Sequence, residues 1–439
     1  MAQLTLAQLC RLLICMIVLL SVFQAVALAV GAAWYPPQTL LQLALTVLFV
    51  AYVAAALKLR IPKALRPEML ALGLFFLYAL VSAVLLPRYF AGIYILYPTG
   101  GLDEEINSPT PLAFDRGNIG QPIFLLMNIA MVVACVVFRS PAFCRSLLSC
   151  WLVAGWISLF FAAYQKLSML FGIYFPAEIL YSNGGYSVGF GLTLDGYERL
   201  NSTFTEPSCA GNVFGAYFCY YLYEFARTRQ IGAVLTALLY AVAVVLTASA
   251  VGYIEILVAL LLVTLQMSGR LLTALAFLLG AVAALAATYF WVPDLVSSVI
   301  LNKAASGSFL NRTASDLFSL DLAVQTKLLG VGLGSNRPSS FLTYLLSNVG
   351  LFGLLSFTGF IFLLFRAKRG LRYTGTRLPS LCAALLVFLA GKVVGVPDLN
   401  VWFMWAMVGL IACEKACLYD QEKVFAYRRH PMVMAEPAT

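Results

Sequence analysis

The sequence predicts an all-α, polytopic integral membrane protein with about twelve transmembrane helices. Of its 439 residues, 62% are hydrophobic and 11% are charged, and the mean hydropathy of +0.91 lies far above that of soluble domains. Apolar runs of about 18 or more residues can span a bilayer as helices. Such runs lie near 12–33, 38–57, 69–86, 120–138, 147–168, 208–226, 231–248, 250–268, 271–291, 341–365, 379–395 and 400–413. We therefore expect one transmembrane domain over 1–413 and a tail over 414–439.

Charge placement predicts the orientation of these spans. Basic residues gather in alternate connections and in the tail, whereas the other connections are long and acidic on balance. Because cytoplasmic connections retain Lys and Arg, both termini are expected to be cytoplasmic. The net charge of +9 is then explained by the basic residues that orient the spans, without a nucleic-acid partner.

Three outer connections are unusually long: 87–119, 169–207 and 292–340. Loops of this length are uncommon unless they are functional or carry structure of their own. In the third, Asn311 to Leu329 is predicted to form an amphipathic helix on the outer membrane surface, with Gly330 as its stop. Its apolar positions recur at helical spacing: Leu310, Leu317, Leu320, Val324 and Leu328.

The ten cysteines show no metal or disulfide pattern, since no CxxC occurs. We expect them to act as small hydrophobic residues, with no metal site and no cofactor. The acidic run at 103–105 resembles a DxD metal motif only loosely and is interpreted as a solvated loop. The N-terminal segment is interpreted as an uncleaved first helix, because its apolar run is long for a signal peptide.

Two charged residues fall inside predicted spans near the outer surface. Glu255 lies one to two turns below that surface and Lys392 about one turn below it. Intramembrane charges are costly and commonly functional, so both are candidate substrate-binding residues. The alternative is a buried Glu255–Lys392 ion pair that only ties two helices together.

A charged, hydroxyl-rich stretch from Arg199 to Ser208 runs directly into the sixth predicted span. Pro207 suits the first position of a helix, so the helix N-terminus points outward with N–H groups that suit phosphate oxygens. The tenth span repeats this arrangement, because Arg337-Pro-Ser-Ser leads into Phe341. Two outward helix N-termini, each near an arginine, predict a receptor for a diphosphate.

These motifs resemble the O-antigen polymerase and O-antigen ligase superfamily. The resemblance covers the hydropathy profile along most of the chain, but its motifs cover only 199–215 and 310–355. It is carried by Arg199, Asn201, Thr205, Glu206, Pro207, Ser208, Arg312, the Gly330-x-Gly332-x-Gly334 stretch and Gly350-x-x-Gly353. It implies a GT-C-like, metal-independent glycosyltransferase of the bacterial inner membrane. Such an enzyme acts at the periplasmic face on glycans carried by undecaprenyl diphosphate.

The chain also departs from the superfamily pattern. The ligases resemble one another in a His-Asn pair eleven residues before a glycine, where this chain has Ser339-Ser340 before Gly350. The single histidine, His430, lies in the predicted cytoplasmic tail. The resemblance therefore implies a polymerase of O-antigen or exopolysaccharide repeats rather than a ligase that transfers glycan to another acceptor. A basic residue common in the superfamily is also replaced, by Ala250.

The implied reaction assigns roles to the candidate residues. A sugar hydroxyl of one lipid-linked repeat attacks the reducing-end sugar of another chain and expels undecaprenyl diphosphate. Arginine forks suit phosphate oxygens, so Arg199 and Arg312 are expected to bind the diphosphate, with Glu206 as general base or as an orienter of an arginine. The expected substrate-binding residues are Arg337, Asn201, Thr205, Ser208, Asn336, Lys392 and Glu255.

Other interpretations remain open at this stage. Arg199 and Glu206 could form a structural salt bridge. A lipid-linked oligosaccharide flippase or another transporter could have the same number of helices, although transporters place polar residues near the midplane. A nonenzymatic assembly partner is a further alternative. The expected partners are the membrane, the lipid-linked substrates and a chain-length regulator protein.

Overall fold

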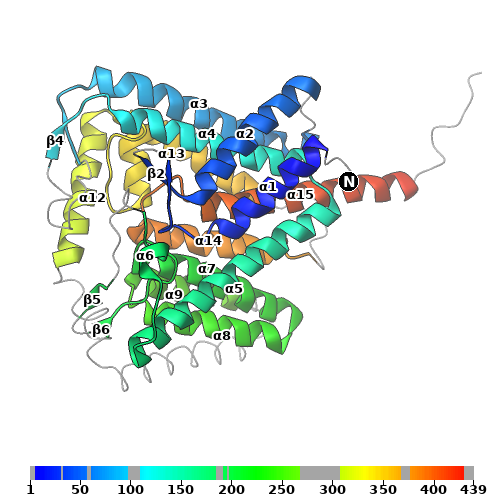
Figure 1. The fold of residues 1–439 in the computed structure, drawn as a ribbon. Coiled ribbons are helices and arrows are strands. Elements are labelled where there is room, and N and C mark those ends of the chain that lie inside the picture. Colours follow the sequence, from blue (N-terminus) through cyan, green and yellow to red (C-terminus); the bar gives the residue numbers. More distant parts are fainter. Residues whose placement is uncertain are drawn as a thin grey trace, which may run out of the picture.

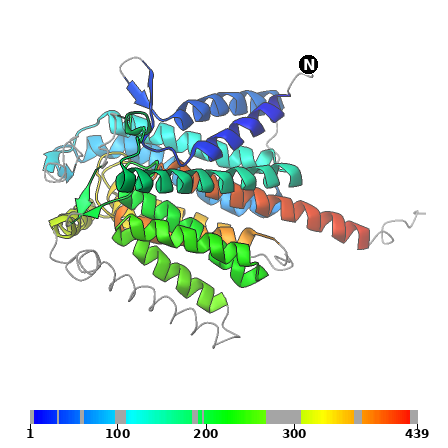
Figure 2. The same ribbon diagram turned by 60° about the horizontal axis from the view of Figure 1, so that its bottom comes forward.

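The protein is a helical bundle in which most long helices run between the same two ends of the molecule (Figures 1 and 2). The computed structural model describes residues 5–30, 33–56, 61–96, 109–183, 191–194, 197–266, 307–366 and 376–429. Its longer helices are α1 (Leu6–Leu20), α2 (Pro37–Ala56), α3 (Arg66–Tyr89), α4 (Arg116–Val137), α5 (Pro141–Phe171), α7 (Pro207–Thr228), α8 (Ile231–Leu246), α9 (Ala250–Gln266), α12 (Gly307–Gln325), α13 (Phe341–Phe365), α14 (Leu378–Gly395) and α15 (Trp402–Arg429).

Short elements gather at one end of the bundle. Three antiparallel hairpins pair β1 (Leu28–Val30) with β2 (Ala33–Tyr35), β3 (Tyr94–Leu96) with β4 (Pro109–Pro111), and β5 (Thr193–Leu194) with β6 (Tyr197–Glu198). The short helix α6 (Ala177–Leu180) lies at this end too, and the exception is the 3-10 turn η1 (Lys63–Leu65), which precedes α3 at the opposite end. Helix α12 and the last two hairpins lie at the left of Figure 1, opposite the end from which α1 starts and toward which α15 extends. We call the left end the loop end.

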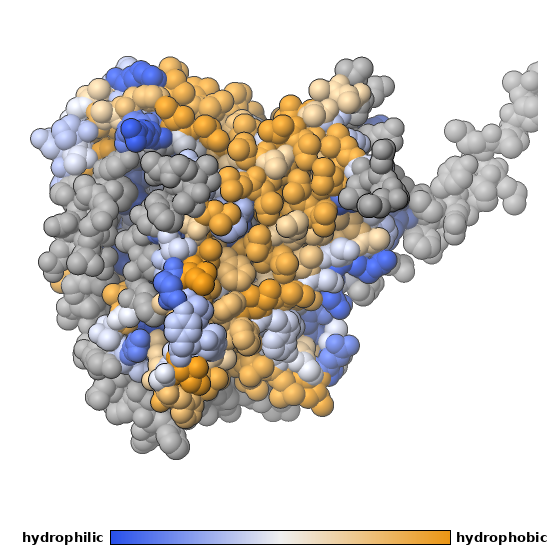
Figure 3. All heavy atoms as spheres, viewed as in Figure 1, coloured by the Kyte–Doolittle hydropathy of each residue, from blue (hydrophilic) through white to orange (hydrophobic). Residues whose placement is uncertain are grey.

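Helix lengths and composition identify a multi-pass membrane protein. Within the described ranges, seven helices are long and apolar enough to cross a bilayer: α2, α3 with η1, α4, α5, α13, α14 and the first part of α15. Apolar side chains cover the middle of the surface in Figure 3. Helices α1, α8 and α9 are apolar but shorter. The predicted span at 271–291 lies outside the described residues.

The first predicted span was wrong in its extent. A helix was expected over 12–33, but α1 ends at Leu20. The side-chain amide of Gln38 donates to the carbonyls of Leu20 (2.6 Å) and Phe23 (2.8 Å), so the backbone acceptors that a longer helix would use are already bound. The chain continues into the β1–β2 hairpin.

The last helix continues past the end of the last apolar run. The predicted boundary between 413 and 414 lies inside α15, which runs without a break to Arg429. Near that point Lys415, only 1% exposed, forms an ion pair with Glu68 of α3 at 2.9 Å. Its ammonium also donates to the carbonyls of Leu363 and Leu364 at the end of α13. One buried cation therefore ties three helices together.

Helix α7 passes through the core, and every residue from Ala210 to Tyr220 is buried. It packs against α8, α9 and α14. A Cβ at Gly215 of α7 or at Gly391 of α14 would overlap the carboxyl group of Glu255 on α9. Both glycines belong to a Gly-x-x-x-Gly sequence, the pattern that lets membrane helices approach closely.

We expect Lys415→Met to destabilise the bundle, because Glu68 would remain buried without its cation. Breaking such a pair from one side costs about 3–5 kcal/mol. Thermal unfolding in detergent measures the loss. The double variant Glu68→Gln/Lys415→Met should recover part of it, and equal stability of wild-type protein and Lys415→Met would contradict the assignment.

Candidate functional site

Residues 199–206 form a loop that hydrogen bonds hold in place, and helix α7 begins at Pro207. Gln165 of α5 accepts from the backbone N–H groups of Asn201 (3.0 Å) and Ser202 (2.7 Å) through its side-chain oxygen. Thr203 donates to the carbonyl of Val22. Asn201 is fully buried, and its side-chain amide donates to the Thr205 carbonyl within the loop.

Glu206 ends this loop at the start of α7, as the sequence predicted from Pro207. It is the N-cap residue and is partly exposed. The hydroxyl of Ser208, which is 3% exposed, donates to its carboxylate at 2.9 Å. Thr205 lies beside it, with its hydroxyl 3.8 Å from the Cys209 sulfur. The partial positive charge of the helix N-terminus favours the ionised carboxylate at this position.

The predicted alternative of an Arg199–Glu206 salt bridge is not formed. The four ion pairs among the described residues do not include it. Arg199 instead donates to the carbonyl of Thr247 at 3.2 Å, in the turn between α8 and α9. Glu206 is therefore not neutralised by the nearest arginine in sequence.

Arg312 reaches the same region from α12. A Cβ at Gly395, the last residue of α14, would lie 2.5 Å from Nη1 of Arg312 and 3.2 Å from a methyl group of Val251. The guanidinium is therefore held between the end of α14 and the start of α9, next to the turn that Arg199 contacts. Within the described ranges, Arg312 has no carboxylate partner.

Two further cations converge on the short connection after α14. Arg337 pairs with Asp398 at 3.1 Å, and both side chains are about two-fifths exposed, at 40% and 42%. The Lys392 ammonium donates to the carbonyls of Val396 (3.0 Å) and Asp398 (2.6 Å). Helix α14, which carries Lys392, packs against α7. The loop end thus gathers Arg312, Arg337 and Lys392 close to the first turn of α7.

A break in α13 holds Arg337 in place. Gly350 has φ +62° and ψ −171°, which interrupts the helix, and the 328–332 backbone pairs with the interrupted segment. The N–H groups of Val331 and Gly332 donate to the carbonyls of Ser347 (2.8 Å) and Asn348 (2.9 Å). Gly330, Gly332 and Gly334 all have positive φ, which explains the predicted tight turn.

Asn336 forms hydrogen bonds that hold this loop to neighbouring elements. It is 2% exposed, and its amide donates to Ser319 (3.0 Å) and Ser347 (2.9 Å) while its oxygen accepts from the Leu96 N–H (2.8 Å). Its backbone N–H donates to the side-chain oxygen of Asn348 at 3.0 Å. The predicted substrate-binding side chain therefore joins α12, α13 and β3 in this structure.

The predicted pair of free helix N-termini needs correction. Asp316 of α12 accepts from the N–H groups of Ser339 (3.0 Å) and Ser340 (2.9 Å) and from the hydroxyl of Thr343 (2.8 Å). The N-terminus of α13 is thus occupied by a carboxylate, and that of α7 carries Glu206. A phosphate would meet an acid at both positions, so the arginines are the better anion ligands.

Helix α12 itself matches the prediction of an amphipathic helix. It spans Gly307–Gln325, whereas Asn311 to Leu329 was expected. Its polar face, with Ser315 and Ser319 at 4% and 0% exposure, packs inward. Its predicted apolar positions point outward and are 39–67% exposed: Leu310, Leu317, Leu320, Val324 and Leu328.

Glu255 and Lys392 are both fully buried, but they do not form the ion pair considered as an alternative. Glu255 points between α7 and α14. In the amide orientation that satisfies its neighbours, Asn212 donates to the Glu255 carboxylate (2.7 Å) and to the Phe388 carbonyl (3.1 Å). Neither Glu255 nor Lys392 is open to a substrate in this structure.

A small cavity of about 190 Å³ lies beside the loop that carries Arg337. It is below the ~300–1,000 Å³ of typical ligand pockets. Its lining comes from the β3–β4 hairpin, the start of α4 and the loop: Ile95, Thr110, Pro111, Ala113, Asp115, Asn118 and Ser335. Asn118 closes one side by donating to the Ser335 hydroxyl at 2.8 Å.

Sequence reasoning missed the residues that organise this end. Asn348 and Gln165 were not singled out, although each is a polar residue inside a predicted span. Asp316 was expected only as a neighbour of Arg312 on the amphipathic helix, and its hydrogen bonds to the start of α13 were missed. Sequence reasoning also treated every cysteine as an isolated hydrophobic residue. Among the described residues, Cys144, Cys413 and Cys417 form a group whose sulfur atoms all lie within 4.8 Å of one another, so they could hold a metal ion.

We expect Asp316→Ala to loosen α12 and the start of α13, because two backbone N–H groups and a hydroxyl lose their acceptor. Loss of a capping residue costs about 0.5–2 kcal/mol. A loss of about 1–2 kcal/mol should accelerate local hydrogen exchange roughly 5- to 30-fold. Exchange in peptides covering 307–325 and 339–343 measures it.

Asp321→Ala is the matched control on the same helix. Among the described residues its exposed carboxylate accepts only from the exposed side chain of Gln325, so exchange should stay close to wild type. Equal acceleration in both variants would show that Asp316 has no special role.

Comparison with known proteins adds no assignment to this geometry. No protein-family model matches the chain, and no curated protein matches it.

Proposed function

We propose that the protein is a polysaccharide polymerase that joins undecaprenyl-diphosphate-linked oligosaccharide repeats at the periplasmic face of the bacterial inner membrane. The loop end would be the periplasmic face. The proposal rests on the resemblance of the 199–215 and 310–355 motifs to the O-antigen polymerase superfamily. A single structural observation supports it most: the two motif regions, far apart in sequence, lie at the same end of the bundle.

The supporting geometry is a group of cations near Glu206, a carboxylate without an ion-pair partner among the described residues. Arg312 lies against the end of α14, and Arg337 pairs with the partly exposed Asp398. Glu206 stands at the start of α7 with only Ser208 as a side-chain donor among the described residues. Guanidinium forks bind phosphate oxygens bidentately and are always charged. Arg312 and Arg337 would therefore bind the diphosphate, and Arg199 would support the neighbouring turn.

The chemical step needs charge stabilisation and proton removal. The acceptor hydroxyl oxygen forms a bond to the anomeric carbon, and the bond from that carbon to the diphosphate oxygen breaks. The electron pair leaves with undecaprenyl diphosphate, where the arginines stabilise the developing charge. The hydroxyl proton goes to Glu206, which acts as general base.

Helix α12 would give the lipid carrier access to this site. Its exposed apolar residues, such as Leu317 and Val324 at 61% and 67% exposure, suit the boundary between headgroups and acyl chains. Arg312 lies on the same helix, so a polyprenyl chain in the membrane could place its diphosphate beside Arg312 without leaving the bilayer.

We expect Arg312→Lys and Glu206→Gln each to slow polymer formation roughly 100-fold or more, because the first loses the fork and the second loses the base. The assay uses purified protein in liposomes with a lipid-linked repeat isolated from a polymerase-deficient strain. Ladder formation on a gel measures the rate.

Arg88→Lys and Glu178→Gln are the matched controls at the same end. Arg88 is exposed and stacks on Phe114, and Glu178 is exposed and accepts from Tyr174. Both should leave the ladder unchanged. Normal ladders from Arg312→Lys and Glu206→Gln would remove their catalytic roles. Transfer of single repeats to another acceptor would identify a ligase, and transport without ladders a flippase.

The same assay tests metal independence. Since arginines rather than a divalent cation stabilise the leaving group in this scheme, ladders should form at an unchanged rate with excess EDTA. Loss of ladders with EDTA and recovery with Mg²⁺ or Mn²⁺ would contradict the arginine mechanism.

A further inference from the structure

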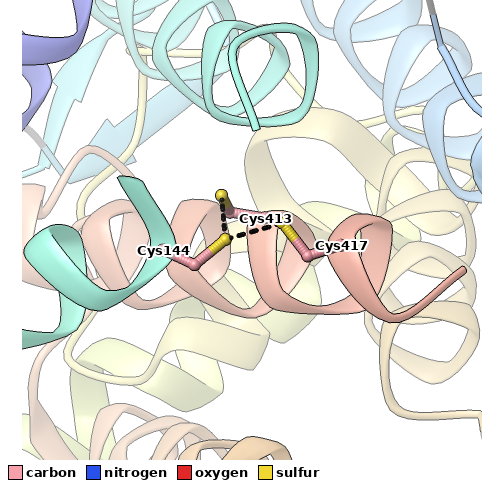
Figure 4. Close-up of side chains that lie close together, drawn as sticks. All are labelled: Cys144, Cys413 and Cys417. Atoms are coloured by element: carbon pink, nitrogen blue, oxygen red, sulfur yellow. Dashed lines mark hydrogen bonds between the residues drawn. The ribbon is translucent and has the colours of Figure 1, made fainter. Parts of the chain in front are cut away.

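Three cysteines meet at the end of the bundle opposite the loop end. Cys413 and Cys417 lie one turn apart on α15, and Cys144 faces them from the first turns of α5 (Figure 4). They are 0%, 7% and 3% exposed, respectively. The nearby Arg139–Asp420 ion pair, at 2.7 Å, closes this region between the same two segments of chain.

The three sulfur atoms are arranged as a compact triangle. The Sγ atom of Cys144 lies 2.9 Å from Sγ of Cys413 and 2.9 Å from Sγ of Cys417. These are contacts between free thiols, longer than the ~2.05 Å of a disulfide bond. Three sulfurs bound at ~2.3 Å to one central ion would lie ~4.0 Å apart. If the Cys144 sulfur moved about 1 Å away from the other two sulfurs, which side-chain rotation permits, the three would form a trigonal site.

The donor set points to a soft metal ion. Thiolates select Cu(I), Zn²⁺ or iron–sulfur clusters, and structural zinc sites normally have four ligands. The described part of the chain supplies three ligands here, and burial leaves little room for water as a fourth. We propose that Cys144, Cys413 and Cys417 form a trigonal Cu(I) site.

Binding is a ligand exchange without electron transfer. Each S–H bond that breaks releases a proton to solvent, each thiolate forms one S–Cu bond, and copper enters and stays as Cu(I). Burial of the resulting negative charge is costly. The Arg139 guanidinium acts against this cost at Cys417, whereas the carboxylates of Asp420 and Glu414 add to it. The site is independent of the proposed polymerase chemistry, which uses the loop end.

The test loads the purified full-length protein in detergent with Cu(I) held in a bathocuproine disulfonate buffer under reductant. We expect one copper per chain by mass spectrometry of metals after removal of the buffer. X-ray absorption should show Cu–S distances near 2.3 Å and no nitrogen ligands. Cys144→Ser, Cys413→Ser and Cys417→Ser should each lose at least tenfold in affinity for Cu(I).

Cys219→Ser and Cys15→Ser are the controls, since both residues lie outside the cluster, and both should retain one copper per chain. Thermal unfolding without copper shows whether each variant is folded. The proposal is overturned if all three folded cluster variants retain copper, or if the Cys15→Ser control loses it. Binding of zinc in preference to copper would also overturn it.

Discussion

Helix α13 is interrupted at Gly350, so some of its backbone N–H and C=O groups lose their partners within the helix. In an apolar bundle these groups need other protein groups as hydrogen-bond partners. The 328–332 segment supplies them as a second strand of backbone, and the side chain of Asn348 holds the loop that follows. Gly350 lies nine residues after Phe341, so the loop reaches ~13 Å down the helix. Everything that projects from this loop, including Arg337, is fixed by that pairing.

The charges of the loop end follow from the same constraint. Buried polar groups must be satisfied, so the Ser340 N–H at the start of α13 donates to Asp316, Lys392 donates to the Asp398 carbonyl after α14, and Asn212 donates to Glu255. The groups that are only partly exposed differ, since Arg312 and Glu206 have no ion-pair partner among the described residues. The contrast favours Arg312 and Glu206 as residues available to a charged substrate, whereas Arg337 would exchange its contact with Asp398 for the substrate.

Sequence predicted well what depends on neighbours in the chain. Apolar runs predicted the helices, Pro207 predicted the start of α7, and the spacing of leucines predicted α12. It failed where a side chain distant in sequence sets a helix boundary or binds a helix end. Gln38 binds the end of α1, and Asp316 binds the start of α13, 23 to 27 residues away. Cys144 and Cys413 are 269 positions apart, so no spacing rule could bring them together. The candidate site was therefore predicted as a set of residues, but not as an arrangement.

The most direct test of the account is an electron cryomicroscopy map of the protein in lipid nanodiscs with undecaprenyl diphosphate. The account predicts diphosphate density at the loop end, within hydrogen-bonding distance of the guanidinium groups of Arg312 and Arg337. Diphosphate density near the bilayer midplane, or at the opposite end beside Lys415, would contradict it.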